Sequence, residues 1–219
     1  FVFGGMTGSG GFLGDLLALD VDTMTWSELT PGDVAGRWPS ARSDMVFNSD
    51  GRHRLFVLCG APTRVDLFML DLTSSPMAWT DLSRLLFPSS SSAPSLLSSA
   101  GSAWAAGCLH VVGGGGQAWS SRIYRFCPDA MSLSEISQQL GGSSPLPSQG
   151  IAAVAVKNQI FVQGGQAGLA LAWFNAPRDV PWGAGAMDFV SVYDWDRLSA
   201  AGSASLPVRV ELCTWLFPC

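Results

Sequence analysis

Leu55-Phe56-Val57-Leu58-Cys59-Gly60 is a short apolar run that ends in glycine, and it recurs three more times in the chain. The other copies are Phe1-Val2-Phe3-Gly4-Gly5, Leu109-His110-Val111-Val112-Gly113-Gly114 and Ile160-Phe161-Val162-Gln163-Gly164-Gly165. Their last glycines, at positions 5, 60, 114 and 165, are separated by 55, 54 and 51 residues. An apolar strand that recurs about every 50 residues predicts the blades of a β-propeller.

The first two copies are each followed by two acidic residues five positions apart and then by a tryptophan: Asp15, Asp20 and Trp26, and Asp66, Asp71 and Trp79. We expect four antiparallel strands per unit, named a to d from the innermost outward, with the glycine pair ending strand b. The acidic residues are expected to cap turns, and both tryptophans to pack between blades. On this interpretation Trp26→Ala costs on the order of 3–5 kcal/mol.

This order of features resembles the kelch repeat, in which a hydrophobic strand ending in Gly-Gly precedes a strand ending in an acidic residue and then a tryptophan-bearing strand. The resemblance covers residues 1 to about 165, although Cys127 and Leu133 replace the acidic residue and the tryptophan in the third unit. It implies one all-β domain over 1–219, a kelch-type propeller of about four blades of four antiparallel strands. The clear repeats lie within 1–165 and the degenerate C-terminal segment spans 166–219.

The chain begins in mid-strand without Met, which favours a fragment of a larger ring. Strand a of the first blade must then come from elsewhere. The apolar segment 208–217 is the one spare candidate, and we expect that it does not close a four-blade ring.

Composition and charge narrow the classes of function. A chain of 219 residues can build a sizeable core, and it is 47% apolar but only 13% charged. Blades covered on both faces by their neighbours account for a mean hydropathy of +0.27. The net charge is −5 and Lys157 is the single lysine, so the basic stripe that binds nucleic acid is missing. With no apolar run of 18 residues, we expect no membrane partner either.

Five cysteines are present, at positions 59, 108, 127, 213 and 219. Their odd number and irregular spacing argue against a disulfide scaffold. Cys59, Cys108 and Cys127 lie in or beside apolar strands, where a free thiol behaves as a small hydrophobe. Because no Asn-x-Ser/Thr acceptor occurs either, the sequence favours a reducing, cytoplasmic location.

No motif predicts a catalytic, metal or cofactor site. The run Gly113–Ala118 matches G-x-G-x-x-A, but a dinucleotide site needs a helix next, and 121–126 reads as a strand. His110 is expected to be a satisfied core histidine and His53 a solvated turn residue. Kelch-like propeller oxidases carry copper on two tyrosines and two histidines, whereas the two tyrosines here, Tyr124 and Tyr193, fall in expected strands. We therefore expect no cofactor.

The kelch resemblance implies a protein-interaction module. The alternative is an enzyme on a kelch-like propeller, either a galactose-oxidase-like oxidase or a sugar isomerase. The b–c and d–a connections are long, and loops on a rigid scaffold are common recognition sites. Tryptophan and arginine are enriched in binding hot spots, so the candidate partner-binding residues are Trp38, Arg42, Arg64, Trp119, Arg122, Trp173, Arg178 and Trp182. The arginines would suit a protein partner with an acidic motif, although some tryptophans could instead be tucked under their own loops.

Overall fold

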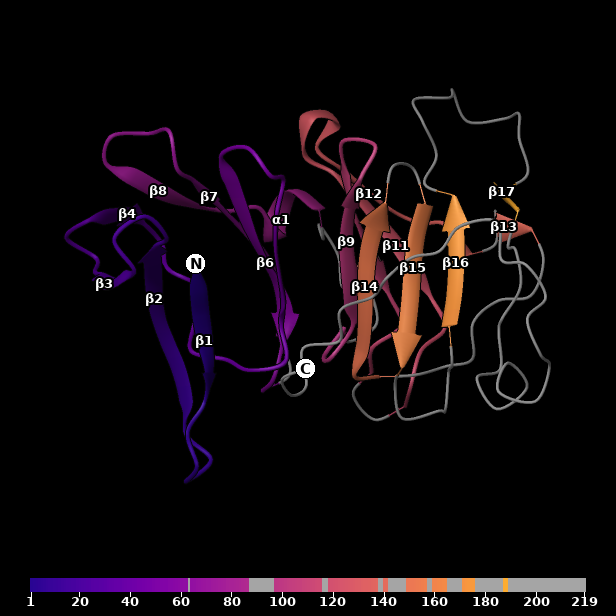
Figure 1. The fold of residues 1–219 in the computed structure, drawn as a ribbon, viewed down its shortest axis with the longest axis horizontal. Coiled ribbons are helices and arrows are strands. Elements are labelled where there is room, and N and C mark those ends of the chain that lie inside the picture. Colours follow the sequence, from indigo (N-terminus) through magenta and orange to yellow (C-terminus); the bar gives the residue numbers. More distant parts are fainter. Residues whose placement is uncertain are drawn as a thin grey trace.

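The computed structural model describes residues 1–62, 64–86, 97–115, 118–137, 140–141, 149–156, 159–164, 171–175 and 187–188. Its elements form small sheets that follow one another in chain order and lie side by side (Figure 1). These sheets, numbered in chain order, are termed blades. The fold is all-β, as expected.

Blade 1 consists of β1 (Val2–Met6), β2 (Phe12–Asp20) and β3 (Thr25–Leu29). Blade 2 consists of β4 (Val34–Gly36), β5 (Val46–Ser49), β6 (Arg54–Gly60), β7 (Arg64–Asp71) and β8 (Met77–Asp81). Blade 3 consists of β9 (Gly101–Ala105), β10 (Cys108–Val112), β11 (Ile123–Cys127) and β12 (Ser132–Glu135). Blade 4 consists of β14 (Ile151–Val156), β15 (Gln159–Gly164) and β16 (Leu171–Asn175).

Four short elements lie between or beside the blades. A one-turn helix, α1 (Ser83–Leu86), follows blade 2, and a 3-10 turn, Pro128–Ala130, joins β11 to β12. The two-residue strands β13 (Leu140–Gly141) and β17 (Met187–Asp188) pair in parallel. No helix in the described part of the chain is long and apolar enough to cross a membrane.

The predicted order of strands a to d is confirmed where the blades are described. Strand b is β1, β6, β10 and β15 in the four blades, and the following antiparallel partner, β2, β7, β11 or β16, is strand c. Blades 2 and 3 have all four predicted strands among the described residues, whereas three strands are described in blades 1 and 4. Blade 2 gains a fifth because β4, which leaves blade 1, pairs in parallel with β8.

The core lies between the blades. Val57 and Phe68 of blade 2 join Phe3 and Leu16 of blade 1 in one cluster of buried side chains. The opposite face of blade 2 belongs to a second cluster, shared with blade 3, and a third joins blades 3 and 4. Successive residues of a strand point to opposite faces, so a strand buried on both faces must be apolar throughout.

The recurring glycine at the end of strand b has a steric cause in blade 2. Gly60 has a φ of 115°, a conformation that side chains rarely adopt. A Cβ there would lie 2.7 Å from the carbonyl oxygen of Ser43, in the segment that leads into β5. Glycine is therefore needed where strand b ends against the chain entering the same blade.

The expectation for the two repeated tryptophans is confirmed for Trp79 and wrong for Trp26. Trp79 is 3% exposed, and its ring centroid lies 5.9 Å from that of Phe3 and 6.4 Å from that of Trp38. Trp26 has the same place in blade 1, opposite Leu19 as Trp79 is opposite Leu70. It is nevertheless 56% exposed, because no described blade covers the outward face of blade 1.

The expectation that the strand cysteines are free is wrong for two of them. Cys108 and Cys127 form a disulfide. The register explains it, because Leu109 is opposite Phe126 and the cysteines are the next cross-strand pair. Cys59 is free and buried, and burial raises the pKa of its thiol to about 12.

Replacing the two tryptophans should have unequal effects on the free energy of unfolding. Trp79→Ala removes a large ring from between two blades and should cost about 3–5 kcal/mol. Trp26→Ala, on the outward face, should cost less than about 1 kcal/mol. Urea unfolding followed by circular dichroism measures both, and equal losses would contradict the arrangement of blades 1 and 2.

Candidate partner-binding surface at the loop end

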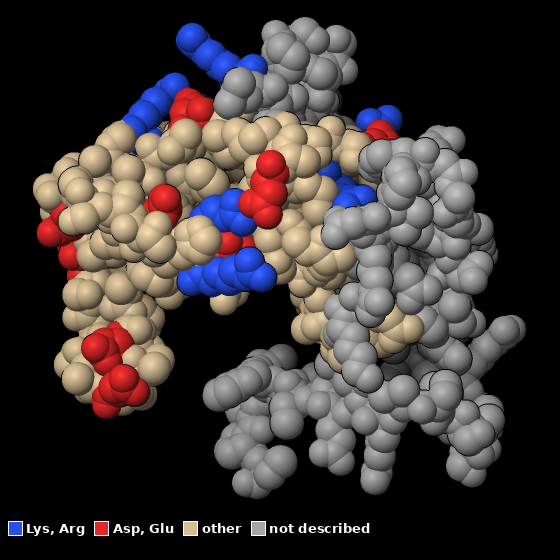
Figure 2. All heavy atoms as spheres, turned by 90° about the horizontal axis from the view of Figure 1, so that it is seen from above, with Lys and Arg blue, Asp and Glu red and all other residues tan. Residues whose placement is uncertain are grey.

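The blades have two chemically different ends. The b–c and d–a connections leave at one end, here termed the loop end. The a–b and c–d turns leave at the other, the turn end. Figure 2 looks onto the turn end, where basic and acidic side chains lie next to one another near the middle of the described surface.

Charges at the turn end are largely satisfied within the protein. Asp50 accepts hydrogen bonds from the backbone amides of Arg52, His53 and Arg54 and from the Arg54 guanidinium at 2.7 Å. Burial alone would raise the pKa of Asp50, but these donors outweigh it and lower the pKa to about 2. Arg54 also reaches Asp129 of blade 3 at 2.8 Å, so it ties two blades together. His53, expected to be solvated, is half-buried in this turn.

Two of the repeated acidic residues cap turns at this end, as predicted. Asp20 accepts hydrogen bonds from the amides of Asp22 and Thr23, each at 2.9 Å. Asp71 accepts from the amide and hydroxyl of Thr73. The corresponding position in blade 3 is Cys127, which is bonded to Cys108 instead.

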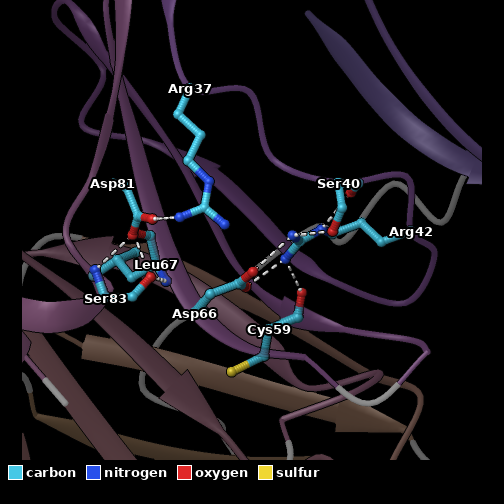
Figure 3. Close-up of polar contacts among 8 residues, drawn as sticks. All are labelled: Arg37, Ser40, Arg42, Cys59, Asp66, Leu67, Asp81 and Ser83. Atoms are coloured by element: carbon cyan, nitrogen blue, oxygen red, sulfur yellow. Dashed lines mark hydrogen bonds and ion pairs between the residues drawn. The ribbon is translucent and has the colours of Figure 1, made fainter.

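Arg42, predicted to bind a partner, is instead a structural residue at the loop end (Figure 3). Its side chain is fully buried. The guanidinium donates to both carboxylate oxygens of Asp66, at 2.5 and 2.8 Å. It also donates to the carbonyl oxygens of Cys59 and Ser40, each at 2.9 Å. A bidentate ion pair of this kind is a strong charge-assisted contact, and here it fixes the d–a connection to the b–c end of blade 2.

Arg37 is a basic residue at the loop end that the sequence analysis did not select. Its side chain is 75% exposed and donates to Asp81 at 2.8 Å (Figure 3). Burial alone would raise the pKa of Asp81, but hydrogen bonds from Ser83 and the charge of Arg37 lower it. The one feature of the sequence that points to Arg37 is its place in the d–a connection, five residues before Arg42.

The remaining described candidates divide into one tucked ring and an exposed pair. Trp38 is half-buried, and its Nε1 donates to the carbonyl oxygen of Val34 at 3.1 Å, so this tryptophan does lie under its own loop. Trp119 is 45% exposed on the b–c connection of blade 3. Arg122, three residues later, has a side chain that is 53% exposed and lies 3.7 Å from a carboxylate oxygen of Glu135.

For the other four candidates, the structure gives either a strand position alone or no description. Arg64 is the first residue of β7, and its side chain is not among those described. Trp173 lies in strand β16 and not in a connection between strands. Arg178 and Trp182 lie outside the described residues.

The comparison with protein families agrees with this architecture. A family model described as the KLHDC2/KLHL20/DRC7 Kelch-repeats domain matches residues 1–165. The chain belongs to the kelch-repeat family. Kelch-repeat domains are in general protein-interaction modules and typically not enzymes. A search of curated proteins found no match to the chain.

Of the tyrosines considered for a copper-type kelch enzyme, Tyr193 lies outside the described residues, and Tyr124 does not come together with His110. Tyr124 faces blade 2, in the cluster that contains Phe126. His110 lies on the paired strand β10, on the same face as Val112, which faces blade 4. Among the described residues, no three His, Cys, Asp or Glu side chains are grouped to hold a metal ion. The glycine run after β10 leads to strand β11 and not to a helix.

The Arg42–Asp66 ion pair should be strongly coupled in stability. Arg42→Leu and Asp66→Leu each leave one partner of a buried pair unmatched, so each should lower the free energy of unfolding by about 3–5 kcal/mol. The double variant should lose less than the sum of the single losses, because neither charge remains. A double-mutant cycle by urea unfolding measures this coupling, and strictly additive losses would contradict the pair.

His110 should make the kelch domain less stable in mild acid. Burial, and then the charge of Arg125 opposite it, lower the pKa of His110 to about 4. An unfolded histidine titrates near pH 6.5, so the unfolded state binds more protons between pH 6.5 and 4. The stabilisation is therefore complete above pH 6.5 and is lost as the pH falls, by about 3 kcal/mol in all.

Unfolding free energies at pH 7, 5.5 and 4 check this prediction. His110→Gln should remove the loss that is due to this residue. His53→Gln replaces the other histidine in the chain and should keep that loss. The prediction fails if His110→Gln and the unmodified chain lose stability equally.

Proposed function

We propose that this kelch domain recognises a protein partner with an acidic motif through its loop end, with Trp119 and Arg122 as the contact residues of blade 3. The observation that carries the proposal is the exposure of Trp119. A tryptophan ring that is 45% exposed on a connection between two buried strands leaves apolar surface for a partner. Tryptophan and arginine at the centre of an interface contribute most to binding energy.

Arg122 is available to such a partner in a way that Arg42 and Arg54 are not. Arg42 is fully buried and paired with Asp66, and Arg54 is held between Asp50 and Asp129. Arg122 is half-exposed, and its contact with Glu135 is long, at 3.7 Å. An incoming carboxylate can therefore approach the guanidinium and form the bidentate contact that favours arginine at acidic interfaces.

Strands β10 and β11 hold the two contact residues firmly. Every residue of β10 is buried, and the Cys108–Cys127 disulfide joins the two strands at the turn end. Backbone bridges from Gly115 to Ser98 and to Trp119 hold the connection between them, so less binding energy is spent on ordering the surface that a partner meets. The sequence prediction adds to this surface Arg64, at the start of β7, and Arg178 and Trp182, which lie outside the described residues, whereas Arg42 and Trp38 do not belong to it.

Selection of peptides on the 219-residue chain tests the proposal. A phage-displayed random peptide library should yield acidic sequences, and the strongest of them serves as a fluorescent probe. Trp119→Ala and Arg122→Ala should each weaken its binding about tenfold or more, which corresponds to about 1.4 kcal/mol. Neither change should alter the unfolding midpoint much, because both side chains are partly solvent-exposed.

Arg52→Ala is the matched control, since Arg52 is an exposed arginine at the turn end. It should leave binding of the probe unchanged. If Arg52→Ala abolished binding while the two loop-end variants bound normally, recognition would belong to the turn end. Enrichment of basic peptides would contradict the acidic motif.

A cytoplasmic location is also proposed, on the absence of Asn-x-Ser/Thr acceptors. The Cys108–Cys127 disulfide argues against it, because reducing compartments keep thiols free. Alkylation of thiols in intact cells, followed by mass spectrometry of the peptides that contain Cys108 and Cys127, tests the location. Labelled cysteines support the cytoplasm, and an unlabelled pair supports an oxidising compartment.

A further inference from the structure

In blade 3, a disulfide stands where the first two blades have an aspartate cap. Strand c of blades 1 and 2 ends in Asp20 and Asp71, each of which accepts hydrogen bonds from the turn that follows. Strand c of blade 3 ends in Cys127, whose side chain makes no hydrogen bond to the described turn and is bonded to Cys108. The corner between strands c and d of blade 3 is thus held by a bond that exists only while the two cysteines are oxidised.

The turn at this corner carries a contact between blades. It is the 3-10 turn Pro128–Ala130, at the upper edge of Figure 1, and it begins directly after Cys127. The amide of Met131 closes the turn by donating to the carbonyl oxygen of Pro128 at 3.1 Å. Asp129, in the middle of the turn, accepts a hydrogen bond from Arg54 of blade 2 at 2.8 Å. The place of this carboxylate therefore depends on the strand end that Cys127 holds.

The two cysteines differ in their access to solvent. Cys108 is 3% exposed, in a strand of which every residue is buried, whereas Cys127 is half-buried. Thiol–disulfide exchange begins when a thiolate attacks one of the two sulfurs, so the more accessible residue is the point of attack. Cys59 of blade 2 is free but fully buried, and its pKa is raised to about 12, so it supplies no thiolate at neutral pH. An incoming thiol is thus directed to Cys127.

We propose that the Cys108–Cys127 bond is a thiol-exchange site through which the redox environment controls the contact between blades 2 and 3 at the turn end. The thiolate of a small thiol reductant attacks Sγ of Cys127, the bond to Cys108 breaks, and Cys108 leaves as a thiolate that takes up a proton. A second thiolate attacks the reductant's sulfur in the mixed disulfide and releases Cys127, which is also protonated. Two thiols are oxidised to their own disulfide, and the two cysteines receive two electrons and two protons.

Reduction should loosen the corner without separating the blades. A cysteine thiol is a weak hydrogen-bonding group and does not replace the carboxylate cap of the other blades. Asp129 then spends less time beside Arg54. Arg54 keeps its 2.7 Å contact with the buried Asp50, and Phe56 and Phe126 pack in the core between the same two blades, with ring centroids 5.7 Å apart. The effect is therefore expected at the turn end alone.

Hydrogen–deuterium exchange of the oxidised chain, and of the chain reduced with a phosphine, tests the corner directly. The Met131 amide should exchange about tenfold faster after reduction, because the turn opens more often. The Thr73 amide, which donates to Asp71 in the corresponding turn of blade 2, should exchange at the same rate in both states. An unchanged rate at Met131 would overturn the proposal. So would an equal acceleration in β6, because the bond would then stabilise the fold as a whole.

Paired substitutions separate the bond from the cysteines themselves. Cys108→Ala with Cys127→Ala should exchange at the corner as the reduced chain does, with or without reductant. Cys108→Ala with Cys127→Asp supplies the cap that blades 1 and 2 use, and should protect the corner under both conditions. If the alanine pair does not fold, the reduced chain itself gives the same comparison. Failure of the aspartate variant to protect the corner would overturn the role given to Cys127.

The contact between the blades needs its own measurement. Asp129→Asn should lower the unfolding midpoint more in the oxidised chain than in the reduced chain. Asp81→Asn is the matched control, because Asp81 pairs with Arg37 at 2.8 Å at the loop end, and its loss should be the same in both states. Equal losses from Asp129→Asn in the two states would overturn the link between the disulfide and the contact.

Reduced glutathione identifies the sulfur that is attacked. After brief treatment, acid quenching and digestion with pepsin, mass spectrometry should find the mixed disulfide on the peptide that contains Cys127. The peptide that contains Cys59 should carry none, and peptides with Cys213 and Cys219 are measured separately. An adduct on Cys108, or a disulfide that excess glutathione leaves intact, would overturn the thiol-exchange site.

Discussion

Burial of both faces of the two inner blades, 2 and 3, is the constraint on which the structure depends. Val57 and Leu58 are neighbours in β6, point to opposite faces and are both 0% exposed. Full burial of such side chains contributes about 1.5–3 kcal/mol each, but only if a blade is present on each side. Stability is thus shared between neighbours, as in other repeat proteins, and a residue's role depends on whether its blade has a neighbour.

Electrostatics refine this packing at the two ends of the blades. At the loop end, the buried Arg42 connects the segment between blades 1 and 2 to Asp66. At the turn end, Arg54 joins Asp50 of its own blade to Asp129 of the next. A buried ion pair adds little net stability over apolar packing. In blade 3, Leu97 and Arg122 stand in the places of Arg42 and Asp66, because Ser98 bridges to Gly115 as Ser43 bridges to Ala61, and Arg122 precedes Ile123 as Asp66 precedes Leu67. The absence of the pair from blade 3 is consistent with a small net contribution, and the pair's value lies in fixing where a connection enters a blade.

The sequence predicted the elements better than the exposure of their side chains. The glycine spacing placed strand b in all four blades, because glycine at that point is a local backbone requirement. Trp26 and Trp79 could not be told apart, since their difference depends on whether a neighbouring blade covers the ring, as blade 1 covers Trp79. Arg42 looked like a loop arginine because its partner, Asp66, is 24 residues away. The signal that would have found it is the joint change to Leu97 and Arg122 in the third repeat.

The candidate site was predictable to a similar degree. Position on a b–c or d–a connection selected Trp119 and Arg122, which are partly exposed, but it also selected Trp38, whose ring packs near that of Trp79. The distinction comes from hydrogen bonding and packing partners that are remote in sequence. In this fold, therefore, an arginine or tryptophan in a connection is a recognition candidate only after contacts with the adjoining blade have been excluded. Trp119 and Arg122 meet that condition in part: the tryptophan is 45% exposed, and the arginine has long contacts with the Tyr124 hydroxyl at 3.4 Å and with Glu135 at 3.7 Å.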